Sequence, residues 1–301
     1  MRFASVGLVG LATLLAGAIP GSQTHASTHS ATSHNIIRVD TARLSTAPED
    51  CVRRDDTGVW TLPTQWIEPR AEPFADLNVA QVHQMLERQP ELLGAASIGK
   101  PNGGSLLNGE QLPASPHWDI QVPDHAWGTP ALVACLQRSV DAVQARFPGS
   151  PPLYIGDLSR QEGGWIRGHR SHQSGIDADI GYYYEGESAW YLEANRNNLD
   201  VERTWALVRA LVTDCETEYL FIDMRIQALL REHADQIGED SDWLGTLFSK
   251  GRNKPGVIRH AWGHQTHIHL RIFDDRAQLT GERVNQANLW ARMHRPSAWA
   301  R

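Results

Sequence analysis

Two short segments of this chain concentrate side chains that can bind a metal ion. They are GHRSHQSGIDADI, residues 168–180, and HAWGHQTHIHLR, residues 260–271. Six of the 14 histidines of the chain lie in these two segments. A catalytic zinc site takes three protein ligands, which are commonly imidazole or carboxylate groups, and leaves one position for water. The residue types therefore predict a zinc site, provided that the two segments meet in space.

Both segments have the alternation that is typical of a β-strand. Side chains of a strand point to opposite faces in turn, so Asp177 and Asp179 share one face and the apolar residues between and beside them share the other. His267 and His269 likewise share a face, about 7 Å apart along the strand. Either motif alone is more typical of a solvated strand face. If the two strands pair, however, imidazoles and carboxylates converge on one spot.

The chemistry expected at that spot is metal-assisted hydrolysis. His172, Asp179 and one histidine of the second segment make up a ligand set for zinc, which polarises a carbonyl group and lowers the pKa of a bound water to about 7. Further histidines nearby can transfer protons or stabilise an oxyanion. The sequence contains no HExxH string and no cysteine spacing of the zinc-finger kind.

The elements that must position these residues are predicted from periodicity. Strands are expected over residues 153–157, 176–184, 218–223 and 266–273, and helices over 74–93, 130–147, 203–213 and 224–232. Thr129 can cap the second helix and Pro130 suits its first turn. Residues 97–130 are expected to form a long loop, because Gly and Pro punctuate them. This uneven order predicts an α+β fold with an antiparallel sheet, rather than repeated βαβ units.

Composition excludes some functions and suggests export. The formal charge of −7 argues against a protein that binds nucleic-acid backbones, and no P-loop or dinucleotide-binding fingerprint occurs. Residues 1–26 have the basic start, apolar run and small-residue end of a signal peptide. We therefore expect an exported protein without a stable membrane anchor, with an uncleaved anchor as the alternative. Residues 27–60 show no sustained period and are expected to be a flexible leader.

Three cysteines bear on the redox state of an exported chain. Cys51, Cys135 and Cys215 allow one disulfide and one free thiol, and the sequence does not select the pair. Cys135 and Cys215 lie in apolar helical patterns, so we expect them to be small core residues.

The two motifs together resemble those of a known protein family. SHQSGIDADI followed by WGHQTHIHLR resembles the penicillin-insensitive murein endopeptidases, which belong to a clan of zinc peptidases with D-Ala-D-Ala carboxypeptidases, lysostaphin-type enzymes and the Hedgehog signalling domain. The resemblance starts near residue 97 and runs to about Phe273. It implies the small antiparallel sheet with flanking helices of that clan, that is, a Hedgehog/D,D-peptidase-like fold. The predicted division is a zinc metallopeptidase domain at 97–273, an N-terminal extension with one helix at 61–96 and a C-terminal extension at 274–301.

The resemblance also implies roles for individual residues. Three are expected to be zinc ligands: His172, Asp179 and His269. His267 matches a catalytic histidine that faces the metal-bound water, and His264 matches a second one, a candidate general base. His169 falls where the family has an additional histidine, sometimes described as a further metal ligand. One zinc ion per chain is expected. A second is not, because no Asp-x-x-His string lies between the two motifs.

The implied reaction is hydrolysis of peptide cross-links of peptidoglycan in the periplasm, at the amide between D-alanine and meso-diaminopimelate. Two alternatives stay open: a D,D- or L,D-carboxypeptidase on the same scaffold, or a non-catalytic zinc-containing module that binds the cell wall. The substrate carries several carboxylates, which three arginines near the first motif could bind: Arg160, Arg167 and Arg170. Trp165, residues 182–184 and Trp262 are candidates for lining a peptide groove, although core packing is expected for at least half of them.

Overall fold

The structure is a computed structural model of the chain, and it describes residues 53–54, 60–61, 73–248 and 255–294. All of them belong to one compact unit, residues 37–301. The predicted signal peptide, Cys51 and most of the predicted leader lie outside the described residues. Within that leader, β1 (Arg53–Arg54) pairs antiparallel with β2 (Trp60–Thr61).

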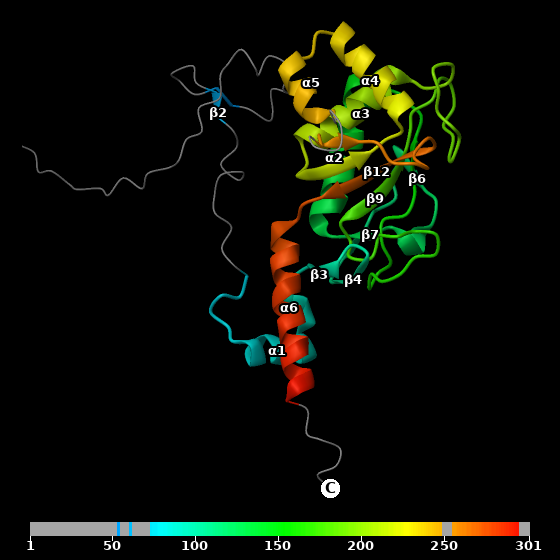
Figure 1. Cartoon of the computed structure of the whole chain (residues 1–301). Helices are drawn as coiled ribbons and strands as arrows, with labels where there is room; N and C mark the ends of the chain where they lie inside the picture. Colours follow the sequence, from blue (N-terminus) through cyan, green and yellow to red (C-terminus); the bar gives the residue numbers. More distant parts are fainter. Residues whose placement is uncertain (1–52, 55–59, 62–72, 249–254, 295–301) are drawn as a thin grey trace, which may run out of the picture. The chain divides into compact units, whose positions relative to one another are not determined.

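A six-stranded sheet carries the two motifs, and its strand order is β11-β10-β12-β9-β8-β6 (Figure 1). The strands are β6 (Trp118–Ile120), β8 (Leu153–Ile155), β9 (Asp177–Gly181), β10 (Thr217–Phe221), β11 (Ile258–Arg259) and β12 (His267–Ile272). The four central strands pair antiparallel, whereas β10 with β11 and β6 with β8 pair parallel. The predicted α+β class is confirmed, and the antiparallel sheet is flanked by a parallel pair at each edge.

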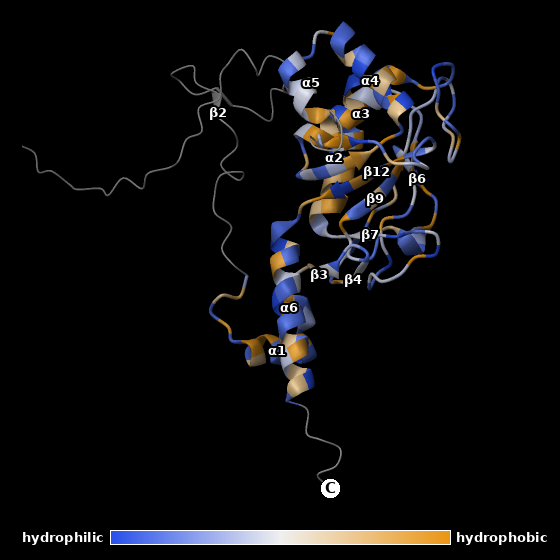
Figure 2. Cartoon of the chain, viewed as in Figure 1, coloured by the Kyte–Doolittle hydropathy of each residue, from blue (hydrophilic) through white to orange (hydrophobic). Residues whose placement is uncertain are grey.

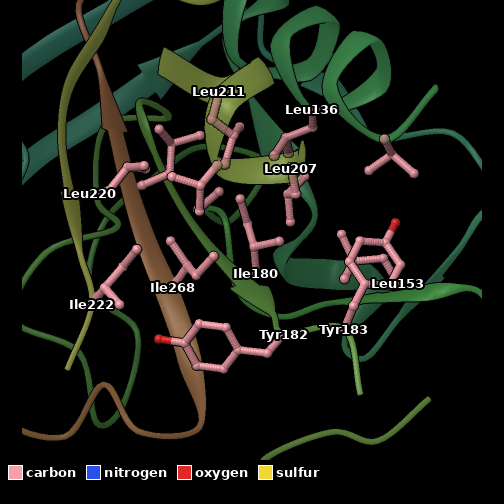
Figure 3. Packing of buried hydrophobic residues seen from close by; sticks show 14 of the residues in the cluster. Leu136, Leu153, Ile180, Tyr182, Tyr183, Leu207, Leu211, Leu220, Ile222 and Ile268 are labelled. Carbon is pink, nitrogen blue, oxygen red and sulfur yellow. The ribbon is translucent and has the colours of Figure 1, made fainter. Parts of the chain in front are cut away.

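One face of this sheet packs into the main core. Ala178 and Ile180 of β9 and Ile268 and Leu270 of β12 are all 0% exposed. Helices α2 (Pro130–Arg146) and α3 (Val201–Thr213) supply leucines opposite them, as Figure 3 shows for Leu136, Leu207 and Leu211. The apolar residues of α2 and α3 lie next to the strands in Figure 2. Because a slip of one residue would move all these side chains to the opposite face, their burial fixes the register of β9 and β12.

The predicted helices begin at capping residues. Thr129 caps α2 by accepting a hydrogen bond from the backbone of Leu132 at 3.4 Å, with Pro130 in the first turn, as the sequence predicts. Aspartates 200, 223 and 240 cap α3, α4 (Met224–Gln236) and α5 (Ser241–Leu247) in the same way. Side-chain caps of this kind stabilise a helix by about 1 kcal/mol each. Helix α5 was not predicted, and at seven residues it is too short to show a clear period.

The expectation of a long loop over residues 97–130 is wrong. This region contains β3 (Ala96–Lys100) paired with β4 (Gly103–Leu107), β5 (Glu110–Gln111) paired with β7 (Trp127–Gly128), strand β6 and a 3-10 turn, η4 (Pro123–His125). The strands are short, so the Gly and Pro residues of their turns dominate the local composition. The helix predicted over 74–93 is α1 (Val79–Arg88) followed by a 3-10 turn, η3 (Pro90–Leu93), since Pro90 cannot continue the α-helical hydrogen bonds.

The C-terminal part of the described chain forms an unpredicted helix, α6 (Asp275–Met293), which packs against α1 and β3. Gly281 lets the helix approach the strand, because a Cβ atom at that position would lie 1.9 Å from the Ser97 carbonyl oxygen. A second small core joins the helices: Val82, Leu93, Val284 and Ala287. None of the helices in the described ranges combines the length and apolar character that a membrane span needs.

Cys135 and Cys215 also make up the disulfide pair that the sequence did not select. They form a disulfide that joins α2 to the residues just before β10, across a sequence separation of 80. Both are buried as expected, at 1% and 7% exposure. Spacing in the sequence could not reveal the bond, because the tertiary fold alone brings the two Cα atoms to 5.5 Å.

Candidate metal centre

The two motifs meet because β9 and β12 are neighbours in the sheet. In their register His269 lies opposite Asp179, Arg271 opposite Asp177 and His267 opposite Gly181. These residues share the face of the sheet that points away from the main core. The predicted pairing of the two strands is therefore confirmed, and it places the carboxylates of one motif beside the imidazoles of the other.

Three potential ligand atoms form a nearly equilateral triangle at this place. Asp179 Oδ1 lies 3.0 Å from His269 Nδ1 and 3.3 Å from His172 Nε2. The two ring nitrogens are 3.1 Å apart. Atoms bound to zinc at its usual distances, at the corners of a tetrahedron, lie about 3.3 Å from one another. The spacing of the three atoms thus suits one tetrahedral metal ion.

The hydrogen bonds behind the triangle turn the ring lone pairs inward. His172 Nδ1 lies 2.8 Å from the Leu158 carbonyl oxygen, and His269 Nε2 lies 3.1 Å from Asp177 Oδ1. Because these partners only accept, each outer nitrogen is assigned the N–H and each inner nitrogen the lone pair. Two lone pairs and a carboxylate oxygen face each other at hydrogen-bonding distance. Such a set requires a cation or a proton at its centre, so the residues fit a metal ion.

Asp177 supports the centre from behind. Its Oδ1 accepts hydrogen bonds from His269 and, at 2.6 Å, from Arg271 Nε. Its Oδ2 accepts the backbone N–H of His172 at 3.1 Å, which helps to hold His172 at a φ of 67° in the left-handed region. The sequence left the role of Asp177 unassigned. The structure places it as the partner that orients two of the three residues of the triangle.

The charges of the metal-free centre are set by burial and by these contacts. Burial alone would raise the pKa of Asp177, but the hydrogen bond and charge of His269 outweigh it and lower that pKa to about 2. The pKa of the Asp179 carboxyl is likewise held well below its usual range, against burial, by His172 and His269. Burial lowers the pKa of His269, yet hydrogen bonds to Asp177 and Asp179 raise it to about 9. Both carboxyls are therefore ionised at neutral pH, and the carboxyl of Asp179 must be ionised to bind a metal ion.

His267 and His264 lie beside the triangle. His267 Nε2 is 3.8 Å from Asp179 Oδ1, and its Nδ1 is 3.0 Å from Thr266 Oγ1. The ring of His264 is centred 4.9 Å from that of His267, and its Nδ1 lies 3.1 Å from the Trp262 carbonyl oxygen. Burial lowers the pKa of His267 to about 4 and also lowers the pKa of His264. Both rings are therefore neutral at pH 7 in the metal-free centre.

His169 also reaches the centre. One ligand atom each of His169, His172 and Asp179 lies within 4.8 Å of the others. His269 is not one of these three, but its Nδ1 lies 3.0 Å from Asp179 Oδ1 and 3.1 Å from His172 Nε2. His169 Nδ1 lies 3.6 Å from Asp179 Oδ2, and its Nε2 lies 2.8 Å from Asp157 Oδ2. The five histidines and one aspartate predicted as ligands or catalytic groups thus lie together, although their roles stay predictions.

The structure adds residues that the sequence did not single out. Tyr191 stacks on the ring of His267, with centroids 5.7 Å apart and an interplanar angle of 16°, at a φ of 60°. Phe221 lies beside the ring of His269, 5.7 Å between centroids. Asp157 contacts two histidines, His125 and His169. Its place at the end of the predicted strand 153–157 was the one available signal, since polar residues at strand ends often line sites.

The predicted substrate-binding residues lie mainly on the surface. Arg160, Arg167 and Arg170 are exposed on the segment that precedes β9. Trp165 and Trp262 are 62% and 84% exposed. The tyrosines at 182–184 are core residues with exposures of 2–3%, in agreement with the expectation that at least half of the aromatic candidates pack in the core.

The sequence of the chain matches a known protein family over most of the described residues. The family model described as penicillin-insensitive murein endopeptidase matches residues 97–287. The chain belongs to this family. The matched residues include the whole cluster of histidines and aspartates, both motif strands and most of α6.

Several members named penicillin-insensitive murein endopeptidase are similar to the chain. The Haemophilus influenzae protein is 26% identical over 199 residues, which cover 59% of this chain and 63% of that protein. The Klebsiella pneumoniae protein is 28% identical over 204 residues, covering 61% and 68%. The Pectobacterium atrosepticum protein is 26% identical over 196 residues, covering 58% and 64%. The chain thus spans a little under two thirds of the first and third of these relatives.

Proposed function

We propose that the chain is a zinc-dependent endopeptidase that hydrolyses peptide cross-links of peptidoglycan, at the amide between D-alanine and meso-diaminopimelate. The observation that carries the proposal is the triangle of His172 Nε2, His269 Nδ1 and Asp179 Oδ1, with edges of 3.0–3.3 Å. The names of the relatives supply the substrate class. The centre would hold one zinc ion, through His172, Asp179 and His269.

A metal ion bound there would polarise the scissile carbonyl group and make a water molecule more acidic. His267 accepts the proton of the attacking water, because its Nε2 lies next to the triangle, 3.8 Å from Asp179 Oδ1. His264, whose ring centroid lies 4.9 Å from that of His267, can take this proton from His267 and pass it to the leaving amine. The water oxygen joins the carbonyl carbon, the C–N bond breaks and the amine leaves with a proton. Proton transfer of this kind contributes about 10²- to 10⁴-fold in rate.

Substrate recognition would use the exposed rim of the centre. The muropeptide carries carboxylates, which the chain's net charge of −7 repels at long range. The guanidinium groups of Arg160, Arg167 and Arg170 offset this locally, since they can bind carboxylates through two parallel hydrogen bonds. Peptidoglycan peptides are thus the proposed partner. Residues 1–26, the proposed signal peptide, would deliver the protein to the periplasm.

The test uses the full-length mature protein and purified cross-linked muropeptide dimers. We expect monomers, identified by mass, with Zn²⁺ present and none after treatment with a chelator. Loss of a terminal D-alanine without monomer formation would instead support a carboxypeptidase. His269→Ala should abolish cleavage, whereas Asp141→Asn, an exposed change on α2 away from the centre, should not alter it. Equal cleavage by His269→Ala and wild type would contradict the proposal.

A further inference from the structure

Asp157 lies just outside the metal centre and contacts two histidines on opposite sides. Its Oδ2 is 2.8 Å from His169 Nε2, and its Oδ1 is 2.8 Å from His125 Nδ1. The side chain of Asp157 is only 18% exposed, and those of His169 and His125 are 25% and 26% exposed. Burial alone would raise the pKa of Asp157, but the hydrogen bonds of His169 and His125 lower it, so the carboxylate is charged.

The backbone around Asp157 holds other parts of the same centre. The Asp157 carbonyl oxygen accepts the N–H of Asp179 at 2.9 Å, and the Asp179 carbonyl oxygen accepts the N–H of Gly156 at 2.9 Å. The next carbonyl, that of Leu158, receives His172 Nδ1 at 2.8 Å. Residues 156–158 therefore fix the positions of Asp179 and His172 through the main chain. The Asp157 side chain does the same for His169.

His125 fixes this segment in turn. Besides its ring contact with Asp157, its carbonyl oxygen accepts the N–H groups of Leu158 at 2.8 Å and Ser159 at 2.9 Å. His125 lies at the end of η4, 32 residues before Asp157, in the region expected to be a loop. His125 thus holds in place both the main chain at Leu158 and Ser159 and the side chain of Asp157.

We propose that Asp157 is a positioning residue that directs His169 Nδ1 toward the metal, and that His125 holds Asp157 in place for this task. The proposal rests on the metal centre proposed above. It assigns to His125, Asp157 and His169 a chain of contacts that ends at Asp179. His169 becomes a fourth protein group that faces the ion.

The tautomer of His169 decides which of its ring nitrogens can bind a metal ion. Because the Asp157 carboxylate can only accept, His169 Nε2 bears the hydrogen and Nδ1 bears the lone pair in the neutral ring. That lone pair faces Asp179 Oδ2 at 3.6 Å. Two electron-rich atoms repel each other at this distance unless a cation or proton lies between them. A carboxylate behind a ligating imidazole also makes the ring a stronger electron donor.

The closing experiment measures metal affinity as well as cleavage. Zn²⁺ affinity is determined by competition with a chromogenic chelator, and the visible absorption of the Co²⁺-loaded protein reports the ligands around the ion. Partners that orient a metal ligand typically contribute about 10- to 100-fold in affinity. We expect Asp157→Ala to weaken Zn²⁺ binding within this range and to change the Co²⁺ spectrum. Asp157→Asn and His125→Gln should also weaken Zn²⁺ binding, by a smaller factor.

A double substitution separates positioning from general damage to the fold. In a His169→Ala background, Asp157→Ala should cause no further loss of Zn²⁺ affinity, because the residue that it orients is gone. The matched control is Asp141→Asn. Asp141 also contacts a histidine, His117, at 3.1 Å, but both side chains are exposed; Asp141 lies on α2 and His117 precedes β6, the edge strand of the sheet. Zn²⁺ affinity and the Co²⁺ spectrum should stay at wild-type values in this control.

The outcomes distinguish the two proposals. Folded Asp157→Ala protein with wild-type Zn²⁺ affinity and Co²⁺ spectrum would overturn the positioning role. An equal loss with and without His169 would overturn it too, since Asp157 would then act on the fold. Wild-type protein that binds Zn²⁺ but leaves muropeptide dimers intact would overturn the proposed function while the positioning role stands. Failure of the wild type to bind either metal would overturn both.

Discussion

The two faces of the β9–β12 pair are built by the same backbone for opposite purposes. On one face Ala178, Ile180, Ile268 and Leu270 are fully buried against the helices. On the other, Asp177, Asp179, His267 and His269 are 0–7% exposed and contact each other. Removing apolar area from water stabilises the first face, whereas burying polar groups costs free energy that their partners must offset. The apolar face therefore sets the register, and the polar face uses that register for chemistry.

The largest expected effect tests the chemistry of the polar face alone. His267→Ala should reduce muropeptide cleavage by about 10²- to 10⁴-fold, because it removes the proposed proton acceptor. The midpoint of urea unfolding should change little, since the three atoms of the triangle stay in place. Cleavage assays and urea titrations on the same sample give both numbers. A cleavage rate within tenfold of wild type would remove His267 from the mechanism.

Metal removal tests whether the polar face depends on a cation for stability. With free Zn²⁺ about 1,000-fold above its dissociation constant, chelation should lower the free energy of unfolding by about 4 kcal/mol. Chelation should lower the free energy of unfolding of the Asp179→Asn protein much less, because this variant lacks the carboxylate ligand. Thermal unfolding with and without chelator measures the difference. The same response in both proteins would mean that zinc binds elsewhere.

The apolar face is tested by Ile180→Ala. The side chain is 0% exposed, so its truncation should cost about 2–5 kcal/mol of stability through lost burial and the cavity left behind. Zn²⁺ affinity of the folded fraction should stay close to the wild-type value. Urea unfolding and a Zn²⁺ competition assay measure the two quantities. A large loss of affinity without a loss of stability would show that the two faces are not separable in this way.

The smallest effect is expected at the outer edge of the polar face. Tyr191 stacks on His267 but is 63% exposed. Aromatic pairs contribute about 1 kcal/mol, so Tyr191→Ala should reduce cleavage by about fivefold. Tyr191→Phe keeps the stacked ring and should stay within twofold of wild type. If Tyr191→Phe loses as much as Tyr191→Ala, the hydroxyl group rather than the stacking matters.

The sequence predicted the part of the centre that depends on local pattern. The alternation around Asp179 and His269 indicated which side chains share a face, and the register confirms it. The four predicted strands and the cap at Thr129 also follow from periodicity and local hydrogen bonding. The residue types and the alternation of polar and apolar side chains were sufficient to predict these strands, because each motif strand has one polar and one apolar face.

What the sequence could not reveal depends on contacts between distant residues. His125 and Asp157 are single polar residues 32 positions apart, and the only signal for either was the place of Asp157 at the end of a predicted strand. The buried face of helix α6 is made of small residues, so its apolar period is weak in the sequence; they are Ala277, Thr280, Gly281, Val284 and Ala287. The left-handed φ of Tyr191 is imposed by its surroundings, since a tyrosine does not favour it.

The disulfide between Cys135 and Cys215 makes the fold sensitive to the redox state around it. It closes a loop that contains β8, β9, α3 and the whole first motif, while β12 lies outside the loop. A closed loop of this length lowers the conformational entropy of the unfolded chain by the equivalent of about 4–5 kcal/mol. Where thiols are kept reduced, that contribution is missing. A chain with the same sequence is then less stable in a reducing compartment than in an oxidising one, so the surroundings of the protein help to set how long its fold persists.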